Sequence, residues 1–469
     1  MAKTRFTPVK PACTNNTGQG ETSFMEWYEA TLFLLGTVLA LMLIGLPVAI
    51  AFIGANILGA IYFMGGYGAL ELQASRGIGQ LVNNAFPSLT TFNLIPVPMF
   101  LLMGELFFYG GLANRMFGAV EVLMGRVPGR LSYVTVAGGT AFATLSGSSM
   151  GSTALLGSLM VPEMSRRGYK KHMSIGPILG TGGLAMLIPP SALAVLLGTL
   201  AQLDIGKLLI GGIMPGIILA SMYVALIWFQ CRIDPEAAPV YDVELPPLSK
   251  RLKMFARDVL PMLSVIIGVI LLIMFGIATP SESAAFGCLG ILALCALYRS
   301  LNFKVIVDST AGALRVTVMA FLIIFGSATF SALLAFSGAS AGLLEWAVSF
   351  ELSPLSMLFI MFGILLVLGM FMDQLSMMLL TVPIFFPLAS QLGFDLIWFG
   401  VIVLLALEIS FTTPPFGLLL FVMKGVAPPD TKMTEIYMAG IPFILCAIAV
   451  VILMVIFPDV ALYLPNLVK

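Results

Sequence analysis

A cluster of hydroxyl side chains interrupts a long apolar stretch of the chain. The segment SGSSMGST at 146–153 combines serine and threonine hydroxyls with glycines, which weaken a helix and free its backbone carbonyls. Where no water competes, such oxygens can bind Na⁺, which needs several weak ligands. We therefore predict a Na⁺ site whose ligands here are Ser146, Gly147, Ser149 and Thr153. The alternative is that the small residues only let helices pack closely.

A second polar cluster surrounds an acidic residue in the apolar segment GMFMDQLSMM at 369–378. A carboxylate at membrane depth is costly without a partner, so we expect Asp373 to face a cavity and bind a cation. A structural hydrogen bond to the end of a neighbouring helix is the alternative. Glu105 and Glu408 also lie within apolar stretches, and we interpret both as polar contacts of the scaffold, with a role as coupling acids as the alternative. The remaining predicted Na⁺ ligands are Gly326, Ser376 and Thr412.

Two proline pairs interrupt apolar segments in a way that can expose ligands. Pro189–Pro190 and Pro414–Pro415 each remove backbone hydrogen bonds to the preceding turn, which frees carbonyl oxygens. Each pair also precedes a new helix, whose first N–H groups can face an anion. A cation and a carboxylate could therefore bind side by side. Single proline kinks are common in membrane helices, so this prediction depends on finding a pair in each half of the chain.

The composition excludes most classes of soluble protein. Of the 469 residues 59% are hydrophobic and 10% are charged, so the solvent around the protein must be lipid. The 23 basic and 23 acidic residues leave no net positive charge for binding nucleic acid. One histidine and five scattered cysteines offer neither a zinc site nor a catalytic triad, and no phosphate-binding loop for ATP occurs. We therefore predict a membrane protein that is not an enzyme.

The apolar segments predict an all-α polytopic membrane protein in two units. Several apolar runs exceed the about 20 residues that one crossing needs and are interrupted by glycine, serine or proline. These runs predict broken helices over 131–165, 173–203, 353–389 and 396–424. Polar residues lie between short apolar arms in 78–110 and 308–338, which predict re-entrant hairpins, with one kinked span each as the alternative. The complete division is a polar tail (1–26), a first unit (27–231), a charged linker (232–257) and a second unit (258–469).

The two units repeat each other in sequence. A shift of 225 residues places Pro162 on Pro387, Gly168 on Gly393 and the first proline pair on the second. If each unit has about five transmembrane helices plus one hairpin that does not cross, the second unit is inverted relative to the first, as in many secondary transporters. Basic residues do not decide which side of the membrane holds the termini, because those of the linker and those of the tail point to opposite orientations.

Four segments, in order, resemble the large membrane permease of the tripartite ATP-independent periplasmic (TRAP) transporters. They are SGSSMGSTALLGSLMVPEMSRRGY (146–169), LAMLIPPSALAVLLG (184–198), GMFMDQLSMMLLTVPIFFPLA (369–389) and TTPPFGLLLFVMKGVAP (412–428). The resemblance implies an elevator-type secondary transporter of the bacterial inner membrane, driven by Na⁺ as coupling ion and without an organic cofactor. It also implies two partners, a small four-helix membrane subunit and a periplasmic substrate-binding protein.

The resemblance further implies a small organic acid as substrate, such as a C4-dicarboxylate, bound between the hairpin tips. The sequence does not indicate which acid. Mapped onto this chain, the predicted substrate-binding residues are Asn93, Ser148, Ser149, Pro190, Ser327, Thr329 and Thr413. The alternative is a stand-alone elevator carrier for dicarboxylates or other anions, which would need no binding protein.

Overall fold

Apolar segments of this chain form helices, because a helix satisfies its own backbone hydrogen bonds without water. The computed structural model describes residues 25–64, 70–90, 92–146, 149–239, 246–370 and 372–467. Within these residues every regular element is helical, which confirms the predicted all-α class. The predicted tail at 1–26 lies almost wholly outside the described residues.

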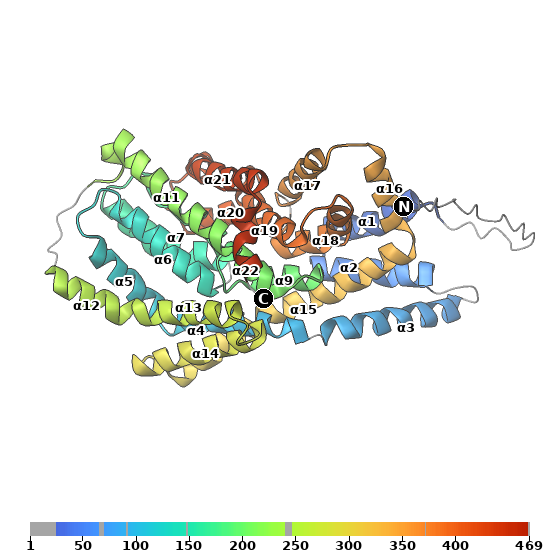
Figure 1. The fold of residues 1–469 in the computed structure, drawn as a ribbon, viewed down its shortest axis with the longest axis horizontal. Helices are drawn as coiled ribbons and strands as arrows, with labels where there is room; N and C mark the ends of the chain where they lie inside the picture. Colours follow the sequence, from blue (N-terminus) through green and yellow to red (C-terminus); the bar gives the residue numbers. More distant parts are fainter. Residues whose placement is uncertain are drawn as a thin grey trace, which may run out of the picture.

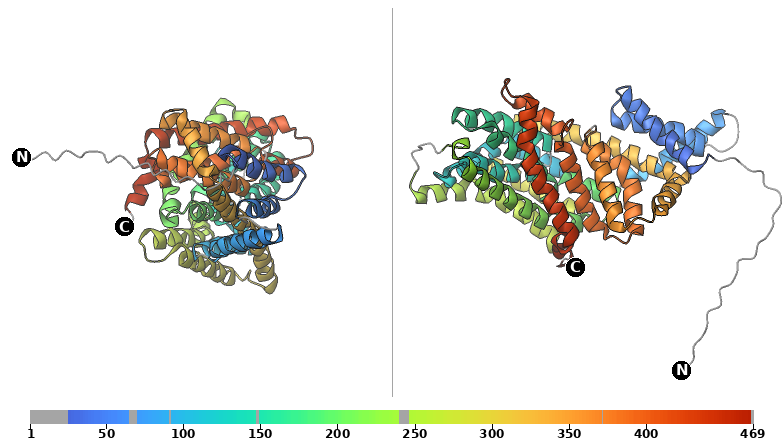
Figure 2. Two further views of the ribbon diagram at one scale, coloured as in Figure 1. Left: turned by 90° about the vertical axis from the view of Figure 1, so that its right-hand side faces the viewer. Right: turned by 90° about the horizontal axis from the view of Figure 1, so that it is seen from above.

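The helices of the first unit run from one end of an elongated molecule toward the other (Figures 1 and 2). They are α1 (Trp27–Leu43), α2 (Val48–Gly59), α3 (Leu70–Leu89), α4 (Pro96–Tyr109), α5 (Leu112–Met124), α6 (Arg130–Ser146), α7 (Ser149–Arg166), α8 (Lys171–Leu187), α9 (Ala192–Leu200), α10 (Ile205–Gly211) and α11 (Ile213–Ile233).

The second unit begins with a short helix within the predicted linker and then repeats the plan of the first. Its helices are α12 (Leu248–Asp258), α13 (Leu260–Met274), α14 (Pro280–Leu297), α15 (Phe303–Phe336), α16 (Ala339–Ser349), α17 (Pro354–Leu368), α18 (Gln374–Gln391), α19 (Leu396–Thr412), α20 (Leu418–Val426), α21 (Met433–Ile456) and α22 (Asp459–Leu467).

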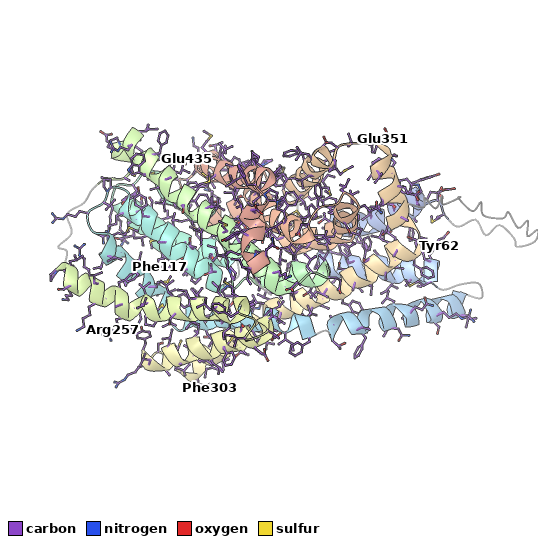
Figure 3. All side chains as sticks on the ribbon, viewed as in Figure 1. Tyr62, Phe117, Arg257, Phe303, Glu351 and Glu435 are labelled. Atoms are coloured by element: carbon purple, nitrogen blue, oxygen red, sulfur yellow. The ribbon has the colours of Figure 1, made fainter. Side chains whose placement is uncertain are left out.

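The helices and the surface are those of a membrane protein. Among the described residues, five helices are long and apolar enough to cross a membrane, or up to eight if each bent pair forms one span. Large apolar side chains are exposed, such as Phe303, which is 80% exposed and lies at the edge of the molecule in Figure 3. Four further apolar helices of the described residues are shorter, at 10–17 residues, and they correspond to α1, α2, α17 and α19.

The repeat seen in the sequence recurs in the element bounds. The 225-residue shift carries α7 onto α18 and α8 onto α19, residue for residue. It also carries 78–111, which contains α4, onto α15. These equivalent stretches pack antiparallel: Glu105 on α4 lies against Gly312 on α15, whereas Val97 lines one cavity with Ala320. Antiparallel packing of equivalent elements agrees with an inverted pair.

The hairpins predicted over 78–110 and 308–338 are wrong. The helix α15 continues without a break through Gly326, and α3 and α4 follow one another along it (Figure 1). The reason is that the polar residues of α15 find partners without unwinding the helix. Thr329 donates from Oγ1 to the Phe325 carbonyl at 2.8 Å, and Asn56 on α2 donates to the Gly326 carbonyl at 2.7 Å.

The helical hairpins lie instead where broken spans were predicted. A Cβ at Gly139 on α6 would lie 3.0 Å from Cδ1 of Leu156 on α7, so these two helices pack side by side as a hairpin. In the second unit, Met361 on α17 and Ile384 on α18 line the same cavity. The predictions of single broken helices over 131–165 and 353–389 are therefore wrong, because serine and glycine at a break permit a reversal as readily as a kink.

The other two predicted broken helices are present as such. The helices α8 and α9 meet at the first proline pair with a bend of 47°, and α19 ends just before the second pair. The glycines of α8 do not interrupt it as predicted, since they serve close packing. A Cβ at Gly180 would lie 2.5 Å from the Phe443 ring, and one at Gly183 would lie 2.7 Å from Cγ of Glu408.

We expect the first hairpin to be trapped by one disulfide. In a chain without native cysteines, Gly139→Cys with Leu156→Cys should oxidise readily, because the two positions touch across the hairpin. In one straight broken helix they would lie about 25 Å apart and could not react. The measurement is the loss of two free thiols in a mass-tagging assay.

The matched control combines Gly138→Cys with Leu156→Cys. A Cβ at 138 would lie 2.5 Å from the ring of Phe117 on α5, so it points away from α7. This pair should keep both thiols free. Equal oxidation of the two pairs would contradict the hairpin.

Candidate functional site

The tips of the two hairpins meet at one cavity of about 430 Å³. Ser149, the first residue of α7, and Asp373 and Gln374, at the start of α18, provide its polar side chains. The remaining walls are apolar and come from α4, α9 and α15, with Phe411 of α19. The cavity therefore lies between the two hairpins and two long helical arms. We use "arm" for α3 with α4 in the first unit and for α15 in the second.

A buried carboxylate joins the two hairpin tips behind this cavity. The Glu408 side chain on α19 is 4% exposed, and its Oε2 accepts hydrogen bonds from Ser149 Oγ and Gln374 Nε2, each at 2.9 Å. Ser149 Oγ also lies 3.0 Å from the carbonyl of Gly182 on α8. One acidic side chain thus connects both hairpins and both broken helices.

Asp373 caps the helix of the second hairpin. Its Oδ2 accepts from the backbone N–H groups of Leu375 at 3.1 Å and Ser376 at 3.3 Å, and its Oδ1 accepts from the Ser376 hydroxyl. These bonds provide a local structural role for Asp373, in its own helix rather than in a neighbouring one. The half-buried carboxylate also lines the cavity.

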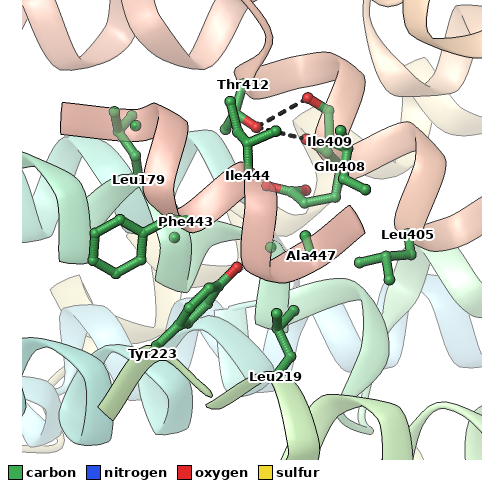
Figure 4. A pocket seen from close by; sticks show the side chains of 13 residues that line it. Leu179, Leu219, Tyr223, Leu405, Glu408, Ile409, Thr412, Phe443, Ile444 and Ala447 are labelled. Atoms are coloured by element: carbon green, nitrogen blue, oxygen red, sulfur yellow. Dashed lines mark hydrogen bonds between the residues drawn. The ribbon is translucent and has the colours of Figure 1, made fainter. Parts of the chain in front are cut away.

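On the side of α8 and α21, Glu408 lines a second, small cavity of about 20 Å³ (Figure 4). Tyr223 on α11 and Thr412 on α19 contribute the other polar side chains, and Figure 4 shows the Tyr223 hydroxyl pointing toward the same region as the carboxylate. Thr412 donates to the Glu408 and Ile409 carbonyls at 3.2 Å and 3.0 Å, so its hydroxyl is satisfied within its own helix. A cavity of this size can hold one water molecule.

The structure separates the predicted site residues into two groups. Ser149, Thr153, Asp373, Ser376 and Thr412 lie near the hairpin tips and Glu408. Pro190 is buried at the α8–α9 break, and Thr413 donates to the Ile409 carbonyl at 2.6 Å.

A second group lies elsewhere or outside the described residues. Gly326 and Thr329 contact Asn56 on α2, and Ser327 is buried on α15 between them. Gly147 and Ser148 lie outside the described residues, as do the side chains of Asn93 and Ser146.

The sequence interpretation did not identify Gln374 or the hydrogen-bond partners of Glu408. The available signal was an acidic residue four positions before Thr412, at the break that the repeat places opposite Gly183. The interpretation of Glu408 as a structural polar contact agrees with these hydrogen bonds, but the sequence did not show that α8 and α19 pack against each other. Gln374 follows Asp373 directly and carried no separate signal.

Comparison with known proteins identifies the family. The model of the family described as tripartite ATP-independent periplasmic transporter, DctM component, matches residues 35–460. The chain belongs to this family. The large permease protein DctM of the C4-dicarboxylate TRAP transporter of Rhodobacter capsulatus is 30% identical over 455 residues, which cover 93% of this chain and 99% of that protein.

Other relatives of this TRAP permease carry different substrate names. The large permease protein UehC of the ectoine/5-hydroxyectoine TRAP transporter of Ruegeria pomeroyi is 28% identical over 440 residues, covering 93% of this chain and 99% of that protein. Among solved structures, the YdaH transporter of Alcanivorax borkumensis matches with a TM-score of 0.61 over 89% of this chain and 97% of its own. At 12% identity, that match supports the fold alone.

Membership confirms the resemblance and the class predicted from composition. The proteins of this family are transport permeases and not enzymes, and this TRAP permease is a membrane protein of that kind. The family implies association with a small membrane subunit and a periplasmic binding protein.

We expect Gln374→Ala to destabilise the permease by about 2 kcal/mol, because it leaves a buried carboxylate with one donor fewer. Thermal unfolding in detergent measures the effect. Thr381→Val is the matched control, since the buried Thr381 hydroxyl lies on the same helix as Gln374 and donates to the Met377 carbonyl of that helix at 2.8 Å. Glu408→Ala should lower the free energy of unfolding less in the Gln374→Ala variant than in the unsubstituted permease, because the hydrogen bond between the two side chains is already lost. Equal losses in the two backgrounds would argue against this hydrogen bond.

Proposed function

We propose that this permease imports a small organic acid across the bacterial inner membrane, driven by a Na⁺ gradient, through an elevator movement. The observation that carries the proposal is the convergence of both hairpin tips on one cavity against the arms α4 and α15. Each hairpin comes from one unit of the repeat, so the two units build one site between them.

The ends of three helices favour an anionic substrate. Ser149, Ala192 and Gln374 line the cavity, and they are the first residues of α7, α9 and α18. The N-terminus of a helix carries unpaired N–H groups and a partial positive charge, so three of them around one cavity attract a carboxylate. No basic residue is among the described residues that line the cavity, so these helix ends must supply the attraction.

The acidic residues at the site favour coupling to a cation. Asp373 lines the same cavity that would take the anionic substrate, and Glu408 lies directly behind it. These two protein carboxylates would repel the carboxylate of a substrate unless cations neutralise them. Na⁺ entering with the substrate would provide that neutralisation and would link uptake to the gradient.

The arrangement of the helices supports an elevator. The hairpins and broken helices are held together through Glu408. The helices α4 and α15 instead pack on each other, and α15 also packs on α2 and α4 on α14. A body that moves as one unit along such arms would carry the cavity across the membrane. The substrate names of the relatives, C4-dicarboxylate and ectoine, support a small organic acid as the substrate class.

The partners of the proposed system are a small four-helix membrane subunit and a periplasmic binding protein that delivers the substrate. The alternative function is a stand-alone carrier for dicarboxylates or other anions. Uptake into liposomes that contain this chain alone would favour the stand-alone carrier.

Uptake should require Na⁺ and not ATP. Proteoliposomes that hold the permease and its membrane subunit, with the binding protein outside, should accumulate substrate under an inward Na⁺ gradient. Replacing Na⁺ with K⁺ should abolish uptake, because the acidic site selects a coupling ion. Unchanged uptake with K⁺ alone, together with collapse on adding a proton ionophore, would point to H⁺ as the coupling ion.

Asp373→Asn should abolish Na⁺-driven uptake while the protein still folds. Asparagine is as good a helix cap as aspartate and keeps an acceptor for the N–H groups of Leu375 and Ser376, but it carries no charge. Asp373→Ala removes the cap as well and should lower thermal stability by about 1 kcal/mol. Normal uptake by the Asn variant would limit the role of Asp373 to capping.

A further inference from the structure

The helix α12, at the end of the charged linker between the two units, buries none of its residues. Leu248 and Leu252 lie four positions apart, so they share one face of the helix, and their side chains are 58% and 51% exposed. Lys253 and Arg257, also four positions apart, are exposed on another face. An exposed apolar face beside an exposed basic face is typical of a helix that lies along a membrane surface.

One side chain joins α12 to two other helices. Arg115, in the first turn of α5, places its Nη1 atom 3.8 Å from Oδ1 of Asp258 at the end of α12. The same guanidinium lies over the ring of Tyr298, which follows α14, with its central carbon 4.9 Å from the ring centre. The Tyr298 hydroxyl donates a hydrogen bond to the Arg257 carbonyl. The ends of α12 and α14 and the start of α5 therefore meet at one point.

Basic side chains gather around this junction. Five of them are exposed, and we call them the basic surface: Lys250, Lys253 and Arg257 on α12, Arg299 after α14, and Lys304 at the start of α15. Phe303 is 80% exposed, and Figure 3 shows it on the same edge of the molecule as Arg257. Asp258 and Asp308, the acidic residues closest in sequence to Arg257 and Lys304, are only partly exposed. In a chain without net charge, this surface concentrates positive charge.

The basic surface lies at the shared end of the two arms. The helix α15 begins at Phe303, and α4 ends at Tyr109, just before α5. Because α4 and α15 pack antiparallel, with Glu105 against Gly312, the end of one arm lies beside the start of the other. A partner that binds the basic surface therefore holds both arms at one end.

The combination of charges and exposed apolar side chains matches an anionic phospholipid. The phosphate would pair with the lysine and arginine side chains, and the acyl chains would cover Leu248, Leu252 and Phe303. A soluble anion would use the charges alone and leave the apolar side chains in water. Basic segments next to the ends of transmembrane helices also mark the cytoplasmic side of a membrane.

We propose that the basic surface binds the head groups of anionic phospholipids in the cytoplasmic leaflet, with α12 lying along that leaflet. Each basic residue near such a leaflet adds to the attraction, so five of them act together. This lipid site is independent of the transported substrate and of the ion that drives uptake. The bound lipids would fix the shared end of both arms while the hairpins and broken helices move.

The test counts the phospholipids that stay bound to the purified full-length permease, by mass spectrometry of the intact protein. Phosphatidylglycerol and phosphatidylcholine with the same acyl chains are offered at equal concentration. The unsubstituted permease should bind phosphatidylglycerol at least about tenfold more strongly. Combining Lys250→Gln, Lys253→Gln and Arg257→Gln should remove most of this preference, because it removes three of the five charges.

Two further triple variants are the matched controls. One replaces both lysines of α12 by arginine and Arg257 by lysine, so it keeps every charge and should keep the preference. The other combines Arg76→Gln, Arg166→Gln and Lys432→Gln, which removes the same charge from exposed side chains on α3, on α7 and before α21, and it should also keep the preference. Thermal unfolding reports whether each variant is folded.

Three results would overturn the lipid site. The first is an unchanged preference in the glutamine variant of α12, or an equal loss in the variant that removes charge elsewhere. The second is displacement of phosphatidylglycerol by inorganic phosphate at constant ionic strength, which would indicate a site for a soluble anion. The third is displacement by the purified small membrane subunit, which would make this surface a protein interface.

A labelling experiment tests the side of the membrane. In a chain without native cysteines, Lys253→Cys should react with a membrane-impermeant maleimide in inverted vesicles and not in spheroplasts. Reaction in spheroplasts would place the basic surface outside the cytoplasmic leaflet and refute the proposal.

Discussion

The hydrogen bonds of the Glu408 carboxylate organise the centre of this permease. Through Ser149 they reach the first hairpin, and through Gln374 they reach the second, although these residues are far apart in sequence. Gly183 on α8 allows the contact, because any side chain there would collide with Glu408. The Glu408 carboxylate in this way links the two units of the repeat beside one cavity.

The same constraint, that polar groups in lipid need partners, explains which polar segments break and which do not. On α15, Thr329 bonds carbonyls of its own helix and Asn56 reaches across from α2, so the helix continues. At Asp373 the side chain caps a new helix, so the chain can end one helix and begin the next. Whether a helix breaks at a polar residue therefore depends less on the type of that residue than on where its hydrogen-bond partner lies.

The repeat places these contacts symmetrically but not identically. The first unit divides its arm into α3 and α4, with a short turn at Phe92–Leu94, whereas the second unit builds α15 as one helix. Ser149 and Gln374 occupy equivalent positions, yet one supplies a hydroxyl and the other an amide to the same carboxylate.

The sequence by itself determined the solvent, the helical class, the 225-residue repeat, the two proline breaks and the family, since these follow from composition and from residues in fixed order. It also indicated Ser149, Thr153 and Asp373 as polar residues in apolar surroundings. Only the tertiary structure decided which polar segments reverse the chain and which stay helical, because that depends on partners from distant helices, such as Asn56 for α15. For the same reason Glu408 looked like a scaffold residue in the sequence: its partners lie on other helices, and no local pattern encodes their meeting.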